Sequence, residues 1–279
     1  MPLKNAVRTV PRHAGPILSR SPGRLLVRIL ITNDDGVNAE GLGVLEKIAR
    51  AISDDVWVIA PESDQSGVGH SLSLSDPLRL RQIDGKRYAV RGTPTDCVLM
   101  GVRQVMKDYR PDLVLSGVNK GHNVAEDVIY SGTIAAAMEG AMLGIQSIAL
   151  SQSFPPGLRE AAPWDCAATH GEAVVRKVLE LGMDPDTLVN VNFPPCPAGE
   201  VEGIAVTAQG RRDPGMLDIE ERADGRLIPY YWLTFRRTPS TPRNGTDLKA
   251  LFERKISVTP LRINMTDEPL MTRYARGFA

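Results

Sequence analysis

The sequence lacks an excess of charge of either sign. Thirty-three Lys and Arg residues balance thirty-three Asp and Glu residues in a chain of 279, so the formal net charge at pH 7 is zero. A protein that holds a nucleic acid polymer by its phosphates needs a broad basic surface. We therefore expect no nucleic acid polymer as a partner, and any recognition of phosphate has to be local.

Cysteine and long apolar segments are also scarce. Cys97, Cys166 and Cys196 are odd in number and widely spaced, which argues against a disulfide framework or a zinc site and fits a reducing cytoplasm. No apolar run approaches the length of about 20 residues that a membrane-spanning helix needs. We therefore expect a cytoplasmic location and no role at a membrane.

Apolar runs alternate with amphipathic stretches through most of the chain. Leu26 to Thr32 is apolar except for Arg28, which predicts a strand buried on both faces, and apolar residues then recur at helical spacing from Leu42 to Ile52. Further apolar runs cover residues 56–60, 113–115, 147–150 and 188–191, and helical patterns cover residues 98–109, 134–143 and 174–178. This alternation predicts an α/β fold with a Rossmann-like, doubly wound, mostly parallel sheet.

The two ends of the chain differ from this pattern. Residues 1–25 are basic, contain no acidic residue and are interrupted by proline, so we expect a disordered extension before a folded domain over residues 26–279. A further hypothesis is that the native chain begins near Val27, which the intact mass of natively expressed protein would decide. Beyond Gly203, strand-like segments are separated by polar stretches, so residues 203–279 are expected to contain an antiparallel appendage.

Two adjacent carboxylates, Asp34 and Asp35, follow the first predicted strand in the sequence NDDG, residues 33–36. Open parallel sheets bind ligands at the carboxyl ends of their strands. Neighbouring acids repel each other unless a cation binds their oxygens, which favours a divalent metal site. The alternative is a simple turn, because Asp-Gly is a common turn dipeptide.

Two later loops offer neutral oxygen ligands. Ser66 and Gly67 follow the second predicted strand, and Asn119 and Asn123 follow the long strand that begins at Leu113. In a doubly wound sheet these strands lie on either side of the first, so the three loops should converge on one crevice. Taken singly, each sequence is also typical of an ordinary loop.

The segment Tyr130-Ser131-Gly132-Thr133 precedes an Ala-rich helical pattern. Free backbone N–H groups at a helix start bind anions, and the two hydroxyl groups add further donors, so a phosphate site is predicted here. Simple N-capping by Ser131 is the alternative. His70 and His122 could act as acids or help to hold substrate, although neither has metal-ligand spacing with another histidine. Lys120, Arg211 and Arg212 could meet a phosphate, but the favoured interpretation is that they are solvated.

Taken together, these motifs resemble the SurE family. They are ILITNDDG (29–36), APESDQSG (60–67), GTPTDC (92–97), SGVN (116–119) and YSGTIAAAMEG (130–140), in this order. The resemblance implies a 5'- and 3'-nucleotidase, in some family members active on short polyphosphate, that needs one divalent cation per subunit, Mg²⁺ or Mn²⁺. It also implies a homodimer or homotetramer whose C-terminal segments are exchanged between subunits.

The resemblance assigns roles by position. It places the metal ligands at Asp34, Asp35, Ser66 and Asn119, and the substrate contacts at Asn33, Gly67, Asn123, Ser131, Gly132 and Thr133. Our hypothesis is that Asp34 or Asp35, preferably Asp34, takes a proton from the attacking water. The alternatives from other classes are a receiver-like signalling domain and a non-catalytic protein that binds metal or nucleotide through the same residues.

Overall fold

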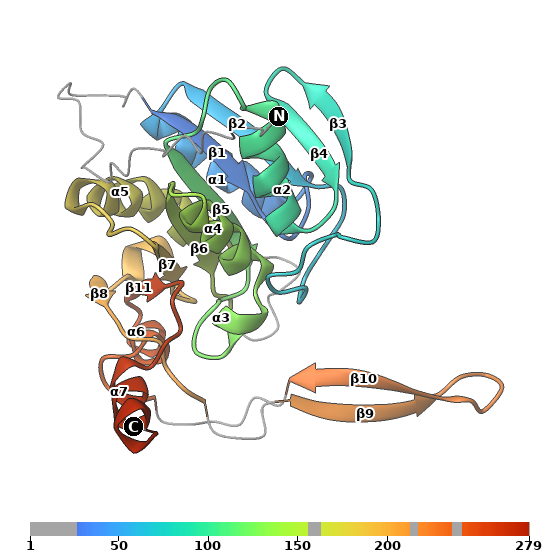
Figure 1. Cartoon of the computed structure of the whole chain (residues 1–279), viewed down its shortest axis with the longest axis vertical. Helices are drawn as coiled ribbons and strands as arrows, with labels where there is room; N and C mark the ends of the chain where they lie inside the picture. The colour runs from blue at the N-terminus through green and yellow to red at the C-terminus, as the bar shows by residue number, and fades with distance from the viewer. Residues whose placement is uncertain (1–26, 156–162, 213–216, 236–241, 279) are drawn as a thin grey trace, which may run out of the picture.

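The computed structural model describes residues 27–155, 163–212, 217–235 and 242–278. The predicted N-terminal extension, residues 1–25, lies outside the described residues. Figure 1 shows a sheet flanked by helices, with a two-stranded ribbon extending from the C-terminal part of the chain.

The main sheet confirms the predicted fold class. Its order is β3-β4-β2-β1-β5-β6-β7-β11-β8, and β1 pairs in parallel with both β2 and β5. The strands are β1 Arg28–Thr32, β2 Asp55–Pro61, β3 Arg79–Asp84, β4 Arg87–Arg91, β5 Leu113–Lys120, β6 Gln146–Gln152, β7 Thr187–Phe193, β8 Ile204–Val206 and β11 Ile256–Arg262. The carboxyl ends of β2, β1 and β5 therefore meet at one edge, as the strand pattern predicted.

Helices cover both faces of this sheet. Ile29 and Ile31 of β1 pack in the core that α1 Glu40–Ile52 and α5 Asp165–Leu181 cover, whereas Leu30 packs in the core beneath α2 Pro94–Met100 and α4 Gly132–Met142. Successive side chains of a strand point to opposite faces, so the apolar run of β1 is explained by burial on both sides. The remaining helical elements are η1 Gly101–Val105, α3 Asp127–Tyr130, η2 Ala198–Glu200, α6 Asp247–Phe252 and α7 Glu268–Gly277.

The start of α2 is fixed by hydrogen bonds between neighbouring residues. Thr93 Oγ1 accepts the backbone N–H of Asp96 at 3.1 Å, and Asp96 Oδ2 accepts the backbone N–H of Thr93 at 2.8 Å. This reciprocal capping box satisfies N–H groups that the helix leaves open. The helix then differs from the pattern predicted for residues 98–109, because a π-helical turn, η1, follows Met100 and helical structure ends at Val105.

The predicted end of the strand that begins at Leu113 was wrong. Residues 116–120 were assigned to a loop, but they continue β5, with an irregular register between Ser116 and Asn119. An added Cβ at Gly117 would lie 2.1 Å from the carbonyl oxygen of Leu150, so close strand contact requires glycine there. Asn119 is therefore held by a strand rather than by a flexible loop.

The C-terminal appendage is confirmed in part of its predicted extent. β9 Leu217–Ala223 and β10 Pro229–Phe235 form the separate antiparallel ribbon. β11 instead extends the main sheet by pairing antiparallel with β7, and β8 pairs in parallel with β11. A search of the described helices finds none with the length and apolar character to cross a membrane.

Candidate active site

The acidic loop after β1 is buried and tightly folded. Asn33 and Asp34 are buried, and the Asn33 side-chain amide donates to the carbonyl oxygen of Gly36 at 2.9 Å. Gly36 has a φ of 104°, and a Cβ there would lie 3.3 Å from the backbone carbon of Ser63. Glycine thus permits a turn that brings the first two loops together.

The start of α4 lies directly against Asp34. Thr133 Oγ1 donates to Asp34 Oδ1 at 2.6 Å. A Cβ on Gly132 would lie 2.8 Å from the Cβ of Asp34, so only glycine lets the first turn of this helix approach so closely. Ser131 caps the helix by accepting the N–H of Ile134 at 3.1 Å, which confirms the capping interpretation of this residue.

The environment of Asp34 disfavours its ionised form. The pKa of Asp34 is raised from 3.8 to about 6, chiefly by burial; the hydrogen bond from Thr133 opposes this shift, and the charge of Asp35 adds to it. Within the described ranges, Asp34 forms no ion pair with Lys or Arg. A cation bound at its oxygens would offset the cost of ionising this carboxyl group.

Asp35 and Asn119 are brought close by the pairing of β1 with β5. The backbone N–H of Lys120 donates to Asp35 Oδ2 at 3.2 Å, so the acidic pair and the end of β5 are in direct contact. The Asn119 amide nitrogen donates to the carbonyl oxygen of Gly121 at 2.9 Å. This bond orients the side chain and makes its amide oxygen the atom suited to a hard cation.

The loop after β2 is joined to the same site through its backbone. The N–H of Gln65 donates to the carbonyl oxygen of Asp34 at 2.8 Å, and the N–H of Gly69 donates to that of Tyr130 at 3.1 Å. The Ser66 hydroxyl, which is exposed, donates to Asp64 Oδ1 at 2.6 Å. Its oxygen keeps lone pairs for a cation, because a hydroxyl group has two acceptor positions.

The donor chemistry fits a hard divalent cation. Carboxylate, hydroxyl and amide oxygens are the ligands that Mg²⁺ and Mn²⁺ favour. Asn33 Oδ1, directly after β1, and Ser116 Oγ, within β5, are buried and lack a hydrogen-bond partner among the described residues. In the part of the chain that the structure describes, no three His, Cys, Asp or Glu side chains form a metal-binding group, so the predicted set depends on Ser66 and Asn119 as well.

Asn123 belongs to a buried polar network. Its side-chain amide donates to Ser151 Oγ at 2.8 Å, its N–H donates to Asn192 Oδ1 at 2.8 Å, and its carbonyl oxygen accepts from Asn190 and Asn192. These hydrogen bonds satisfy the polar groups of Asn123, so its burial has a structural explanation. Its contact with substrate stays a prediction, as does that of Gly67, which has a φ of 78° in an exposed turn.

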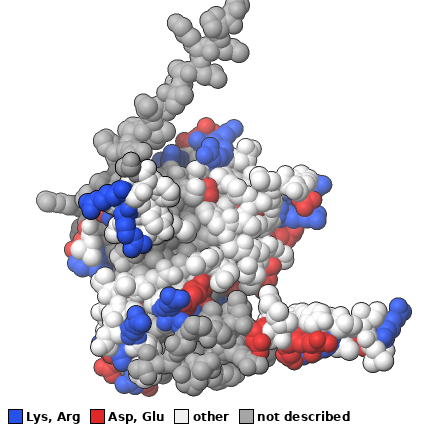
Figure 2. Space-filling view, turned by 60° about the horizontal axis from the view of Figure 1, so that its bottom comes forward, with Lys and Arg blue, Asp and Glu red and all other residues white. Residues whose placement is uncertain are grey.

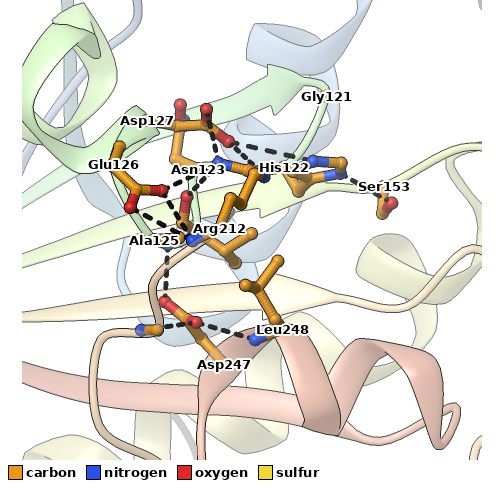
Figure 3. Close-up of polar contacts among 12 residues, drawn as sticks. Gly121, His122, Asn123, Ala125, Glu126, Asp127, Ser153, Arg212, Asp247 and Leu248 are labelled. Carbon is orange, nitrogen blue, oxygen red and sulfur yellow. Dashed lines mark hydrogen bonds and ion pairs between the residues drawn. The ribbon is translucent and has the colours of Figure 1, made fainter. Parts of the chain in front are cut away.

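The solvated interpretation of Arg212 was wrong, and Asp127 and Asp247 were missed. Figure 3 shows Arg212 against Glu126 and Asp127, and Asp247 against the loop at Ala125. These contacts join residues 85 and 122 positions apart, so no local spacing could reveal them. The histidines lie in similar contacts: His70 Nε2 is 3.1 Å from Glu139 Oε2, and His122 Nδ1 is 3.1 Å from Ser153 Oγ.

Comparisons with known proteins identify a family. Residues 29–215 match the model of the family described as survival protein SurE. The chain is 63% identical over 253 residues to a protein of Methylobacterium radiotolerans named 5'-nucleotidase SurE, covering 91% of this chain and all of that one. A protein of the same name from Beijerinckia indica is 62% identical, covering 90% and 96%.

A solved structure is similar over most of the chain. The crystal structure of the SurE protein from Aquifex aeolicus has a TM-score of 0.76 and 39% sequence identity, covering 88% of this chain and 97% of that chain. The family match spans the acidic loop, the end of β5 and the start of α4. Sequence and fold therefore agree on the region that contains the candidate site.

Proposed function

The chain belongs to the SurE family and is a 5'-nucleotidase, and we propose that it hydrolyses nucleoside 5'-monophosphates with one divalent cation held by Asp34, Asp35, Ser66 and Asn119. The observation that carries this proposal is the direct contact of the acidic loop with both β5 and the first turn of α4. That contact puts carboxylate oxygens beside a helix start suited to phosphate.

The first turn of α4 supplies the proposed phosphate site. Backbone N–H groups at Gly132 and Thr133 are among those that an α-helix leaves without intrahelical partners. The helix dipole favours an anion at this end. Thr133 also bonds Asp34, so a phosphate on these N–H groups would lie beside the acidic pair.

The chemistry divides between the cation and the chain. A divalent cation, Mg²⁺ or Mn²⁺, supplies charge neutralisation at the phosphoryl group and acidifies a water molecule when bound. Asp34 is the proposed base that accepts the water's proton, because it is a buried carboxylate that contacts the start of α4, where the phosphate is proposed to bind. Asp35, Asn119 and Ser66 orient the site.

Three finer assignments extend the proposal. We expect hydrolysis of 3'-monophosphates and of short polyphosphate at the same site, on the ground of family membership. A cytoplasmic location is supported by three cysteines that are free and buried. Family membership favours the nucleotidase over the receiver-like and non-catalytic alternatives.

A homodimer or homotetramer is also proposed. The β9–β10 ribbon extends from the body in Figures 1 and 2, and Ile219 and Leu233, which face each other across its two strands, are 63% and 72% exposed. A two-stranded ribbon is marginally stable alone. A second copy of the chain is the proposed cover for this apolar pair.

Phosphate release from AMP tests the reaction directly. We expect release with Mg²⁺ or Mn²⁺, none in EDTA, and recovery when the metal is restored. Asp35→Ala should lower the rate by about 10²-fold or more because it removes a proposed metal ligand. Metal-dependent release that survives both Asp35→Ala and Asp34→Ala would contradict the proposed site.

A further inference from the structure

The stretch from Gly121 to Tyr130 connects two parts of the candidate site. It begins directly after β5, which carries Asn119, and it leads into Ser131, which caps α4. It contains α3, a helix of four residues. This stretch therefore links the proposed metal ligand to the proposed phosphate site along the chain.

Ala125, in the middle of this stretch, has a left-handed backbone with a φ of 54°. Residues with a Cβ rarely adopt this conformation without support from their surroundings. Both of its backbone polar groups are bonded to side chains from the C-terminal part of the chain. Its N–H donates to Asp247 Oδ2 at 2.9 Å, and its carbonyl oxygen accepts from Gln209 Nε2 at 2.8 Å.

Arg212 holds the same stretch through charge. Its guanidinium donates to both carboxylate oxygens of Asp127, at 2.9 and 2.6 Å, and to the carbonyl oxygen of Val124 at 3.1 Å. Its backbone N–H donates to Glu126 at 3.1 Å. The side chain is 18% exposed, and a two-pronged pair of this kind fixes orientation as well as distance (Figure 3).

Asp247 joins three segments at one carboxylate. Besides Ala125, it accepts the backbone N–H groups of Gly210 at 2.9 Å and Leu248 at 2.7 Å, and it is fully buried. A Cβ on Gly210 would lie 2.6 Å from its Oδ1, so glycine is required for this approach. The contacts bring residues 209–212, residues 247–248 and the stretch after β5 together.

We propose that Gln209, Arg212 and Asp247 are positioning residues for the nucleotidase reaction. They form a clamp that fixes residues 121–130, and so sets Asn119 against Ser131 and the first turn of α4. The clamp rests on the proposed function only in its effect on catalysis. Its effect on the local backbone is independent of any reaction.

Arg212→Ala is the principal test, and Arg176→Ala is its matched control. Arg176 is also partly buried and bonds one carboxylate, Glu172, and one carbonyl oxygen, that of Ala51. Arg176 lies on α5 and bonds the end of α1, at the edge of the sheet opposite the candidate site. Arg212→Ala loses three side-chain hydrogen bonds and Arg176→Ala loses two, but only Arg212 contacts residues 121–130.

Three measurements on the full chain separate local positioning from general destabilisation. Backbone hydrogen exchange over residues 121–131 should be about tenfold faster in Arg212→Ala, while the central strands keep their protection. The kcat/KM for AMP should fall by about tenfold or more, chiefly through kcat. Calorimetric affinity for Mn²⁺ alone should weaken by about tenfold.

Further variants keep the test decisive if Arg212→Ala folds poorly. Arg212→Lys should recover part of the loss, because charge remains but the two-pronged geometry does not. Asp127→Asn should resemble Arg212→Ala, and Gln209→Ala should give a smaller change in the same exchange readout. Arg176→Ala should leave all three measurements within about twofold of the parent protein.

The clamp is wrong if Arg212→Ala and Asp127→Asn leave exchange over residues 121–131 and kcat/KM unchanged. It is equally wrong if Arg176→Ala reproduces their effects, since these would then reflect overall stability. A parent protein that neither binds Mn²⁺ nor hydrolyses AMP would instead overturn the proposed function. Hydrogen exchange would still decide whether the clamp holds the stretch.

Discussion

The two sides of the candidate site are held in place by different forces. Asp34 lies two residues after β1, whose residues Ile29, Leu30 and Ile31 are fully buried between two layers of helices. Residues 121–130 are held by hydrogen bonds and ion pairs from distant side chains, above all Arg212. Apolar burial fixes the acidic side, and polar contacts fix the other. Substitutions should therefore separate the two sides.

Asp34→Asn should have the largest effect on the acidic side. Hydrolysis of AMP is expected to fall by about 10³-fold, because the variant loses the proposed base and a charged ligand. The free energy of unfolding in EDTA should instead rise in this variant. The pKa of Asp34 is raised by burial and by the charge of Asp35 from 3.8 to about 6, so the folded state binds this proton more tightly than the unfolded state does.

The sign of the pH dependence follows from that difference. The contribution of Asp34 to stability is fully present below pH 3.8 and is lost as pH rises through about 6. Asparagine stays neutral, so at pH 7.5 the variant should exceed the parent by on the order of 3 kcal/mol. Urea unfolding in EDTA at pH 5 and pH 7.5 measures this gap. A gap that fails to widen with pH, or a similar gain for the exposed Asp84→Asn, would contradict the account.

Gly132→Ala should have the next largest effect, and it tests close packing at the junction of the two sides. The added Cβ would lie 2.8 Å from Asp34 Cβ and 3.0 Å from Pro94 Cγ. We expect kcat to fall by about tenfold to 10²-fold, with a loss of about 1–3 kcal/mol in unfolding free energy.

Gly43→Ala is the control for that substitution. It lies in α1 with nothing within 4 Å of the added Cβ, so it should leave activity unchanged and stabilise the helix by about 0.5–1 kcal/mol. Steady-state kinetics and urea unfolding compare the two variants. Equal activity in both would show that the approach of α4 to Asp34 is not needed.

The ribbon should give the smallest effect on the site. Ile219→Glu combined with Leu233→Lys replaces the apolar pair by two opposite charges that face each other across the two strands. The oligomer should dissociate in light scattering, whereas Mn²⁺ affinity stays within about twofold of the parent. Leu181→Lys, on the exposed end of α5, should leave the mass unchanged. An undiminished mass for the ribbon variant would disprove this role.

The acidic side could be predicted from sequence, because local periodicity records it. The apolar run of β1 predicts burial on both faces, and the strand order then brings the loops after β1, β2 and β5 to one edge. The continuation of β5 through Asn119 was missed, because the glycine-containing sequence SGVN lacks the apolar character of a strand. Close contact with β6 favours a strand there despite that composition.

The clamp side could not be predicted in the same way. Arg212 meets Asp127 across 85 residues, and Asp247 meets Ala125 across 122. A polar pair at such a separation has no periodicity, and each member resembles an ordinary solvated side chain in the sequence. β8 and β11 were placed outside the main sheet for a related reason, since partners of a strand depend on the assembled fold rather than on the strand itself.

Anomalous diffraction from crystals soaked in Mn²⁺ tests the central claim most directly. The account predicts one anomalous peak per subunit, within coordination distance of oxygens from Asp34, Asp35 and Asn119, with the Ser66 hydroxyl beside it. A peak elsewhere, or a peak that touches the acidic pair while Asn119 and Ser66 lie beyond coordination distance, would contradict it.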